Sequence, residues 1–335
     1  MTITPPSAAS PWPHRWAIAL ACATFPLLWV GGLVTTTDAG MAVPDWPSTY
    51  GYNLFLYPWQ SWLAGPWDVF VEHGHRLLGA TTGMITIGLL IVLWRSDERR
   101  WMRGLGVAAL VLVTVQGIMG GMRVLLDERT LAMFHGVTGP LFFAVGVAMV
   151  VLTSKRWRER ATGSAGAGPI RALATVTCIL VYLQIVLGAI LRHIPIAAEP
   201  TTFALAVKFH LFLAAVLSLH IVLLVYLVLR RARSIRPLAG LAVTLAGLLF
   251  LQLALGAGTW IVKYAIPTWA AGWLPPMTTA IQDGGAMQTH VITAHVAVGS
   301  LLLATTLALA LYAHRLLAAP VPARNVGLRP LEAAV

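Results

Sequence analysis

The stretch "EHGHRLLGATTGMITIGLLIVLWR", residues 72–95, joins an ionisable start to a long apolar run. No charged residue lies between Arg76 and Arg95. This uncharged run has about the length that an α-helix needs to cross a hydrocarbon core about 30 Å thick. Arg95 closes the run, as expected of a cation at a membrane surface. The stretch therefore predicts a transmembrane helix with a polar cluster at one end.

Seven further apolar runs of this kind occur in the 335 residues. Because 58% of the residues are hydrophobic and only 10% are charged, with a mean hydropathy of +0.78, an ordinary soluble globular protein is excluded. The sequence predicts an all-α polytopic membrane protein with eight transmembrane helices. The predicted spans are 16–34, 71–94, 104–122, 131–153, 171–191, 203–229, 238–262 and 289–313.

The positive charges predict the orientation in the cell membrane. All but six of the 23 Lys and Arg residues fall on one side of an eight-span arrangement, so the positive-inside rule predicts that both termini are cytoplasmic. The six exceptions are Arg76, Arg123, Arg129, Arg192, Lys208 and Lys263. We attribute the net charge of +11 to this topology and to contact with anionic membrane lipids, and we expect no nucleic acid partner.

A hairpin of two helices is repeated four times along the chain. Its first helix carries "VQGIMGG" (115–121), "LQIVLGA" (183–189) or "LQLALGA" (251–257), and the first hairpin has "LWVGGL" (28–33), with Trp29 aligned to the three glutamines. The repeat predicts two pseudo-symmetric four-helix bundles, 16–155 and 171–316. A linker at 156–170 joins them, and cytoplasmic tails at 1–15 and 317–335 flank them.

The second helix of each hairpin carries a histidine, followed four residues later by Gly or Ala. Each histidine lies 20 residues before a cation at the other end of its helix. At 1.5 Å per residue, the four imidazoles share one depth about 30 Å from the cytoplasmic cations, toward the outer face. The pairs are His75 and Arg95, His135 and Lys155, His210 and Arg230, and His295 and Arg315. His290 does not fit this spacing.

Four imidazoles at one depth predict metal ligands, because facing histidines can bind a porphyrin iron from both sides without adding charge to the membrane interior. Two hairpin pairs would give two heme sites. Two alternatives remain: buried histidines that only hydrogen-bond to neighbouring helices, and a zinc site, which lacks further Cys, Asp or Glu ligands on three of the four helices.

Glu72 breaks the repeat, since Ala132, Val207 and Ile292 occupy the corresponding positions before the other histidines. This asymmetry predicts that the two sites differ in task, with Glu72 exchanging protons. The alternative is a surface acid that pairs with Arg76 or caps its helix.

Further polar side chains near the outer ends of the helices have two interpretations each. Arg76 is expected to bind a heme propionate or a lipid phosphate, as are Arg123 and Arg192. His73 is expected at a loop edge. The loops near 35–70 and 263–288 are rich in Trp, Pro and Gly, which is typical of the membrane interface or of a lid over a heme.

The combination of "GGLVTTTDAGMAVPDWPSTYG" (31–51), Glu72-x-x-His75-Arg76, "VQGIMGG" and "FHGVTG" (134–139) resembles the heme A synthase family. The resemblance covers nearly the whole chain. It implies oxidation of the C8 methyl group of heme O to a formyl group, with oxygen from water, for a terminal heme-copper oxidase.

The resemblance also implies roles for individual residues. The first half would bind heme O through His75 and His135, and Glu72 would be the catalytic carboxylate. The second half would hold a heme b cofactor through His210 and His295. Implied partners are the farnesyltransferase that makes heme O and cytochrome c oxidase assembly factors, and an oligomer is compatible with the family.

One departure concerns cysteine. Many family members carry a cysteine pair in the first outer loop, whereas residues 38–51 contain none, so no loop disulfide can relay electrons here. Cys22 and Cys178 fall inside predicted helices and are expected to be small core residues without a disulfide.

Two other functional classes use some of these features. A b-type cytochrome that transfers electrons to or from quinone would need the histidines but not Glu72. A proton-linked transporter would use Glu72 and the histidines as a relay, but it would normally place its polar groups at mid-depth on broken helices.

Overall fold

The computed structural model describes residues 10–158, 168–195, 197–264, 266 and 284–317. Within these residues, eight helices are long and apolar enough to cross a membrane, which confirms the all-α polytopic prediction. They are α1 (Trp12–Thr36), α3 (Trp67–Ser96), α4 (Arg100–Leu126), α5 (Arg129–Thr153), α7 (Gly168–His193), α8 (Pro200–Arg231), α9 (Arg236–Tyr264) and α10 (Ala286–Leu316). Three short helical segments accompany them: η1 (Ala39–Met41), α2 (Trp59–Leu63) and α6 (Lys155–Arg158).

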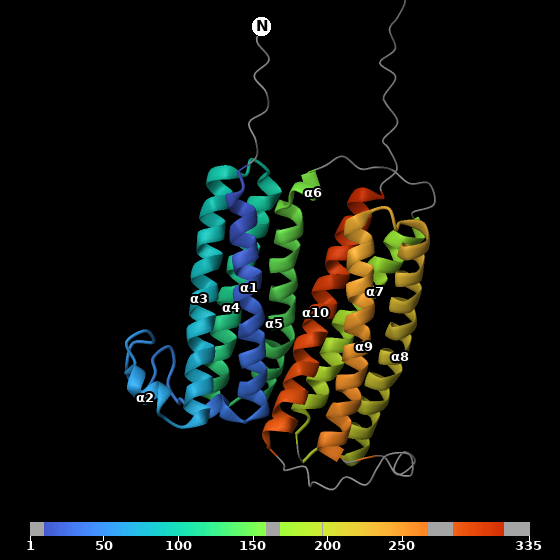
Figure 1. The fold of residues 1–335 in the computed structure, drawn as a ribbon. Helices are drawn as coiled ribbons and strands as arrows, with labels where there is room; N and C mark the ends of the chain where they lie inside the picture. The colour runs from blue at the N-terminus through green and yellow to red at the C-terminus, as the bar shows by residue number, and fades with distance from the viewer. Residues whose placement is uncertain (1–9, 159–167, 196, 265, 267–283, 318–335) are drawn as a thin grey trace, which may run out of the picture.

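The long helices run side by side in two groups, α1 with α3 to α5, and α7 to α10 (Figure 1). Helices α5 and α10 occupy the centre, since 61% and 72% of their apolar windows are buried, against 17–33% for the other six. The buried face of α10 is rich in Ala, Gly, Ser and Thr, whose small side chains let neighbouring backbones approach closely. The outer helices keep large apolar side chains exposed, as lipid contact requires.

Each group of helices has a hydrophobic core cluster of its own. Leu20, Leu89 and Met149 belong to the first, and Ile221, Leu245 and Leu309 belong to the second. The pseudo-symmetry between the two halves stays a prediction.

Both cysteines are free, but the expectation that Cys22 lies in the core is wrong, because it is exposed on the lipid-facing side of α1.

The start of α1, the helix α6 and the end of α10 lie at one end of the bundle, and α2 lies at the other (Figure 1). We call these the α6 end and the α2 end. The predicted boundaries shift at the α6 end: α1 begins at Trp12, inside the predicted tail, and α6 and the start of α7 occupy part of the predicted linker. Residues 159–167 of that linker, and 1–9 and 318–335 of the tails, lie outside the described residues.

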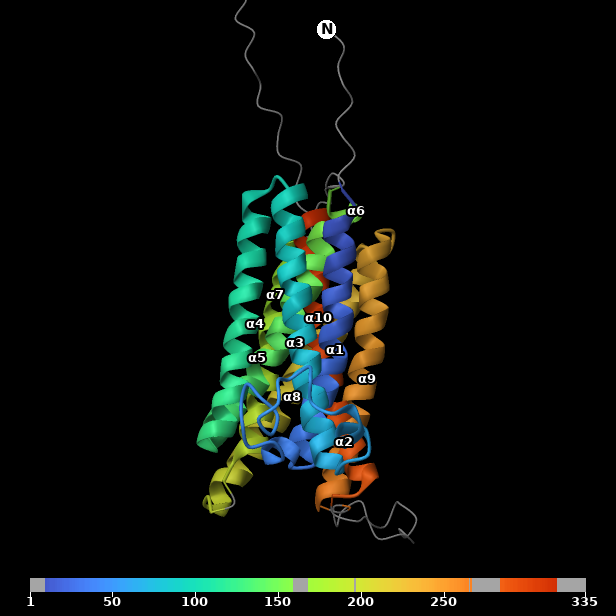
Figure 2. The same ribbon diagram turned by 90° about the vertical axis from the view of Figure 1, so that its left-hand side faces the viewer.

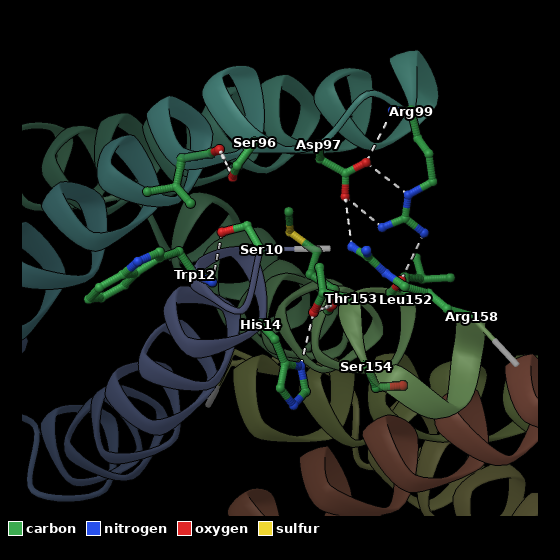
Figure 3. Close-up of polar contacts among 12 residues, drawn as sticks. Ser10, Trp12, His14, Ser96, Asp97, Arg99, Leu152, Thr153, Ser154 and Arg158 are labelled. Atoms are coloured by element: carbon green, nitrogen blue, oxygen red, sulfur yellow. Dashed lines mark hydrogen bonds and ion pairs between the residues drawn. The ribbon is translucent and has the colours of Figure 1, made fainter. Parts of the chain in front are cut away.

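A buried carboxylate organises the basic α6 end (Figure 3). Asp97 is 3% exposed and pairs with Arg99 at 2.6 Å and Arg158 at 3.7 Å. Burial raises the pKa of Asp97, but hydrogen bonds from Arg99 outweigh this and lower it overall. Arg99 also donates to the backbone oxygen of Leu152 at 3.0 Å, so the connection between α3 and α4 is fixed to the end of α5.

Candidate functional site

Two of the predicted ligands meet between α3 and α5. The ring centroids of His75 and His135 lie 6.1 Å apart, and the ring planes are almost perpendicular. A metal–imidazole bond is about 2 Å long, so two imidazoles on opposite sides of one metal ion have centroids roughly 6 Å apart. The spacing of this pair therefore fits a single iron between the rings.

The second predicted pair, His210 on α8 and His295 on α10, lies close enough for the imidazoles to interact electrostatically. His290 is exposed instead, as its spacing along the chain suggested. No group of three or more His, Cys, Asp or Glu side chains that could hold a metal ion occurs among the described residues. The donor sets are thus pairs of neutral imidazoles, which suit heme iron better than zinc.

Every one of the four histidines packs against a glycine on the preceding long helix. A methyl group added to that glycine would press on the Cε1 atom of the imidazole. The distances are 2.9 Å for Gly31 and His75, 3.1 Å for Gly120 and His135, 3.4 Å for Gly188 and His210, and 3.2 Å for Gly256 and His295. The glycine of each repeat is therefore a seat for a histidine ring.

This contact corrects the alignment of the first repeat. Gln116 precedes its glycine, Gly120, by four residues, and the residue four before Gly31 is Leu27. The alignment of Trp29 with the glutamines was therefore wrong by two residues. In the first hairpin, Leu27 occupies the position of the glutamines.

The glutamines orient the histidines of their hairpins. The His135 Nδ1–H group donates to the backbone oxygen of Gln116 at 3.1 Å, and the Gln116 amide donates to the backbone oxygen of His135 at 3.2 Å. Because a carbonyl oxygen can only accept, His135 presents an unprotonated Nε2, the atom that a metal would bind. The Gln184 amide nitrogen lies 3.2 Å from both ring nitrogens of His210.

Several buried polar atoms around the histidines have no hydrogen-bond partner. They include the amide oxygens of Gln116, Gln184 and Gln252. Unpartnered buried polar atoms are costly, and their clustering is typical of a site that binds a ligand. The pattern fits a heme between each pair of rings.

Glu72 lies one helical turn before His75 and is 2% exposed. Its Oε1 atom accepts a hydrogen bond from Arg76 at 2.7 Å, and its Oε2 atom accepts one from the backbone nitrogen of Val43 at 2.8 Å. The carboxylate is therefore held rigidly between α3 and the loop that follows α1.

Arg76 pairs with Glu72, as one of the two interpretations of that acid expected, and it also binds three backbone oxygens of the loop. Its Nη1 donates to the backbone oxygens of Asp45 and Ser48, at 2.6 and 2.9 Å, and its Nη2 donates to Val43 O and Glu72. All four terminal N–H groups are used, so the expected propionate contact would require Arg76 to release the loop. Arg76 therefore fastens this loop in the structure, and its binding to a heme propionate stays a prediction.

Residues 38–51, which we call the cap loop, lie at the α2 end of the bundle (Figure 2) and are bonded to α3 through Arg76 and to α4 through Arg123. The Trp46 ring lies directly against Gly121, beside the Gly120 seat of His135, and Arg123 donates to the backbone oxygen of Gly40 at 2.9 Å. A lid function of this loop stays a prediction. Most of the other expected lid, near 263–288, lies outside the described residues.

His73 was expected at a loop edge, and this was wrong. The residue is 2% exposed, its Nδ1 lies 3.0 Å from the Thr49 hydroxyl, and its ring packs against Tyr57 and Trp62. A histidine on the loop-facing side of α3 is covered once residues 49–62 fold back onto that helix. The sequence gives the helix face, but not the segment that covers it.

Asp45 holds the tip of the cap loop together. Its carboxylate accepts hydrogen bonds from the Ser48 hydroxyl at 2.5 Å, Tyr50 N at 2.8 Å and Gly51 N at 2.9 Å. Gly51 has a φ of +79°, which suits a residue without Cβ. Burial raises the pKa of Asp45, but the hydrogen bonds, first of all from Gly51, outweigh it and lower the pKa below 3.8.

Asp45→Asn is expected to loosen the cap loop at neutral pH, because one oxygen acceptor and the negative charge are lost. Hydrogen exchange of the Tyr50 and Gly51 amides should accelerate about tenfold, since a hydrogen bond to a charged group contributes about 1.5–3 kcal/mol. In the unchanged protein the stabilising contribution is complete above pH 3.8 and is lost as the pH falls through the lowered pKa. Asp127→Asn, at an exposed turn, is the control, and equal acceleration in both variants would contradict the assignment.

Known proteins resemble this chain over the region that contains the first site. A family model described as Cytochrome oxidase assembly protein (COX15-CtaA) matches residues 66–208, which include Glu72, His75 and His135. A protein named Heme A synthase from Exiguobacterium sp. is 24% identical over 251 residues, which cover 70% of this chain and 78% of that protein.

Two further relatives match over shorter lengths. A Heme A synthase from Staphylococcus haemolyticus is 26% identical over 184 residues, so this chain spans 58% of that protein's length. A Protoheme IX farnesyltransferase from Halobacterium salinarum is 30% identical over 139 residues, but the match covers only 28% of that protein.

Proposed function

We propose that this chain converts heme O to heme A, because its residues 66–208 match the family model of cytochrome oxidase assembly proteins and a relative named Heme A synthase matches 70% of the chain. In the overall reaction the C8 methyl carbon gains one oxygen atom from water and becomes a formyl group. Four electrons and four protons leave, and the electrons pass to an acceptor in the membrane.

One observation carries the proposal: a pair of imidazoles with a spacing that suits one iron lies one helical turn from a fixed, buried carboxylate. A heme carrier needs only the imidazoles. An enzyme that removes protons from a heme substituent also needs a base near the ring edge. Only the first half has such a carboxylate, so we assign the substrate heme O to His75 and His135.

The side chains of the first half have separate tasks in this proposal. His75 and His135 hold the substrate and fix its orientation, supported by Gly31, Gly120 and the Gln116 carbonyl. Glu72 accepts protons as the methyl carbon is oxidised. The cap loop restricts the access of bulk water, because Arg76 and Trp46 fasten it to α3 and α4.

The second half is proposed to hold heme b between His210 and His295. When bound there, heme b would supply one-electron transfer and carry electrons away from the substrate site. The cap loop has no cysteine pair, so a loop disulfide has no part in this electron path.

We propose that the α6 end faces the cytoplasm, because it carries most of the cations. Both termini would then be cytoplasmic, and the histidines would lie toward the outer face of the cell membrane. The proposed partners are the farnesyltransferase that supplies heme O, the assembly factors of cytochrome c oxidase that receive heme A, and membrane lipids.

The direct test is to purify the protein from cells that make heme O and to identify the extracted hemes by mass. Heme b together with heme O, its hydroxylated form or heme A supports the proposal. Heme b alone would favour a b-type cytochrome, and the absence of heme would rule out both.

The apolar tail of heme O has a candidate groove on α3. A side chain added at Gly79, one turn beyond His75, or at Gly83 would meet no atom within 4 Å. Gly136 and Gly139 on α5 differ, because they face His193 and Leu28. We therefore assign the farnesyl tail to the Gly79–Gly83 side.

Gly79→Leu is expected to lower the amount of heme O retained by about tenfold, because a bulky side chain in an occupied groove costs about 1–3 kcal/mol. Heme b should remain. Gly104→Leu is the matched control, since Gly104 also has open space but lies near the α6 end of α4. Extraction and quantification of both hemes measures the effect, and unchanged heme O in Gly79→Leu would contradict this placement of the tail.

A further inference from the structure

Arg192, near the α2 end of α7, reaches from the second group of helices to the first. Its Nη2 atom donates to the Thr36 hydroxyl at 2.5 Å and to the backbone oxygen of Gly32 at 3.1 Å, both on α1. A partly buried cation therefore bridges the two halves of the molecule.

The surroundings of Arg192 connect it to both histidine pairs. On its own helix, Gly188 lies one turn away and is the seat of His210. On α1, Gly32 follows Gly31, the seat of His75. The Thr36 hydroxyl lies 3.3 Å from the hydroxyl of Thr293, two residues before His295 on α10.

The charge of Arg192 lacks a counterion in the part of the chain that the structure describes. No ion pair found there includes Arg192, and both of its hydrogen bonds go to neutral oxygens. Arg123 differs, because Glu72, Asp38 and Asp127 all act on it electrostatically. Burying a cation without a counterion is costly, so an anionic ligand at Arg192 would be strongly favoured.

We propose that Arg192 binds a carboxylate of the heme held by His210 and His295, that is, one of its propionates. This inference rests on the proposed heme b site. Both Nη2 N–H groups donate to α1, so the propionate would bind to Nη1, which donates to no atom among the described residues, and the side chain starts one turn from the seat of His210. A lipid phosphate has similar chemistry and is the competing source of the anion.

The position of Arg192 also links the two sites. The Nη2 that bonds Gly32 and Thr36 belongs to the same guanidinium that would bind the propionate. Binding of heme b would therefore stabilise the contact of α7 with α1, next to the seat of His75.

The test compares Arg192→Gln, Arg192→Lys and the exposed outer control Arg129→Gln in purified full-length protein. Heme b content and the midpoint potential of the bound heme are measured by redox titration. Loss of the cation leaves the propionate charge unbalanced, which stabilises ferric over ferrous heme, so the potential should fall in Arg192→Gln. A tenfold change in relative affinity corresponds to about 59 mV.

Arg192→Lys keeps the charge and should fold even if the Gln variant does not. It should retain a potential near that of the unchanged protein but lose heme b about tenfold more readily, because one ammonium group cannot bond to α1 and to a propionate in the geometry of the guanidinium. Arg129→Gln should change neither quantity, and an equal shift there would overturn the inference.

Other outcomes separate the possible failures. If the potential and the heme content are unchanged in Arg192→Gln while bound phospholipid phosphorus falls, Arg192 binds a lipid phosphate and the inference is wrong. If the unchanged protein contains no heme b, the proposed cofactor site itself fails and the inference fails with it.

Discussion

Glu72→Gln is expected to reduce heme A formation at least about a hundredfold, the usual range for loss of a general base being about 10²–10⁴. Glutamine cannot take up the protons released from the methyl carbon. Val43 N–H and Arg76 each donate a hydrogen bond to one oxygen of the carboxylate. In glutamine an NH2 group replaces one of these oxygens, so one of the two donors loses its acceptor. Heme b should remain bound, because its ligands lie on α8 and α10.

The measurement is heme A produced per bound heme O, by extraction and mass analysis, as a function of pH. Glu72→Asp restores a carboxylate at a shorter reach and should recover part of the activity, which a purely structural role in holding the cap loop would not predict. Glu128→Gln, at an exposed turn, is the charge control. Full heme A production in Glu72→Gln would show that the proton role is wrong.

His210→Ala and His75→Ala are expected to have opposite effects on the two hemes. Loss of His210 removes one ligand of the second site, and heme b per protein should fall at least tenfold. Loss of His75 should abolish retention of heme O and leave heme b in place, because the two pairs lie on different helices. Alanine is chosen to replace the histidines because its side chain cannot bind heme iron, whereas that of methionine can.

The control for this pair is His290→Ala, which removes an exposed imidazole from the same helix as His295. It should leave both hemes bound. Spectra of the purified variants and the masses of the extracted hemes measure the effects. Unchanged heme b in His210→Ala would contradict the cofactor assignment, and loss of both hemes in each variant would indicate one shared site.

The number of helices and the depth of the histidines could be predicted without the structure, because both depend on local properties of the chain. An apolar run long enough to cross the hydrocarbon core forms a helix wherever it packs. The spacing of 20 residues from His75 to Arg95, repeated in the other hairpins, sets the depth through the rise per residue alone. The same local reasoning separated His295 from His290.

The contacts between helices could not be predicted in this way. The bonds of Arg76 to the loop carbonyls of Val43, Asp45 and Ser48 form only once the cap loop folds back. His73 was expected at an edge, and it is buried by a segment that starts 24 residues before it. Both contacts depend on the path of a loop, which is set by packing that is remote in sequence.

Local properties of the chain were enough to predict an eight-helix membrane bundle, which the structure confirms, and four histidines at one depth, which stays a prediction, since apolar length and helical rise are properties of single helices. Only the tertiary structure decided that His75 and His135 face each other, that Leu27 rather than Trp29 matches the glutamines, and that Arg192 reaches α1. Small residues such as Gly31 and Gly32 permit these approaches, but which side chain fills the space depends on how whole helices pack against one another.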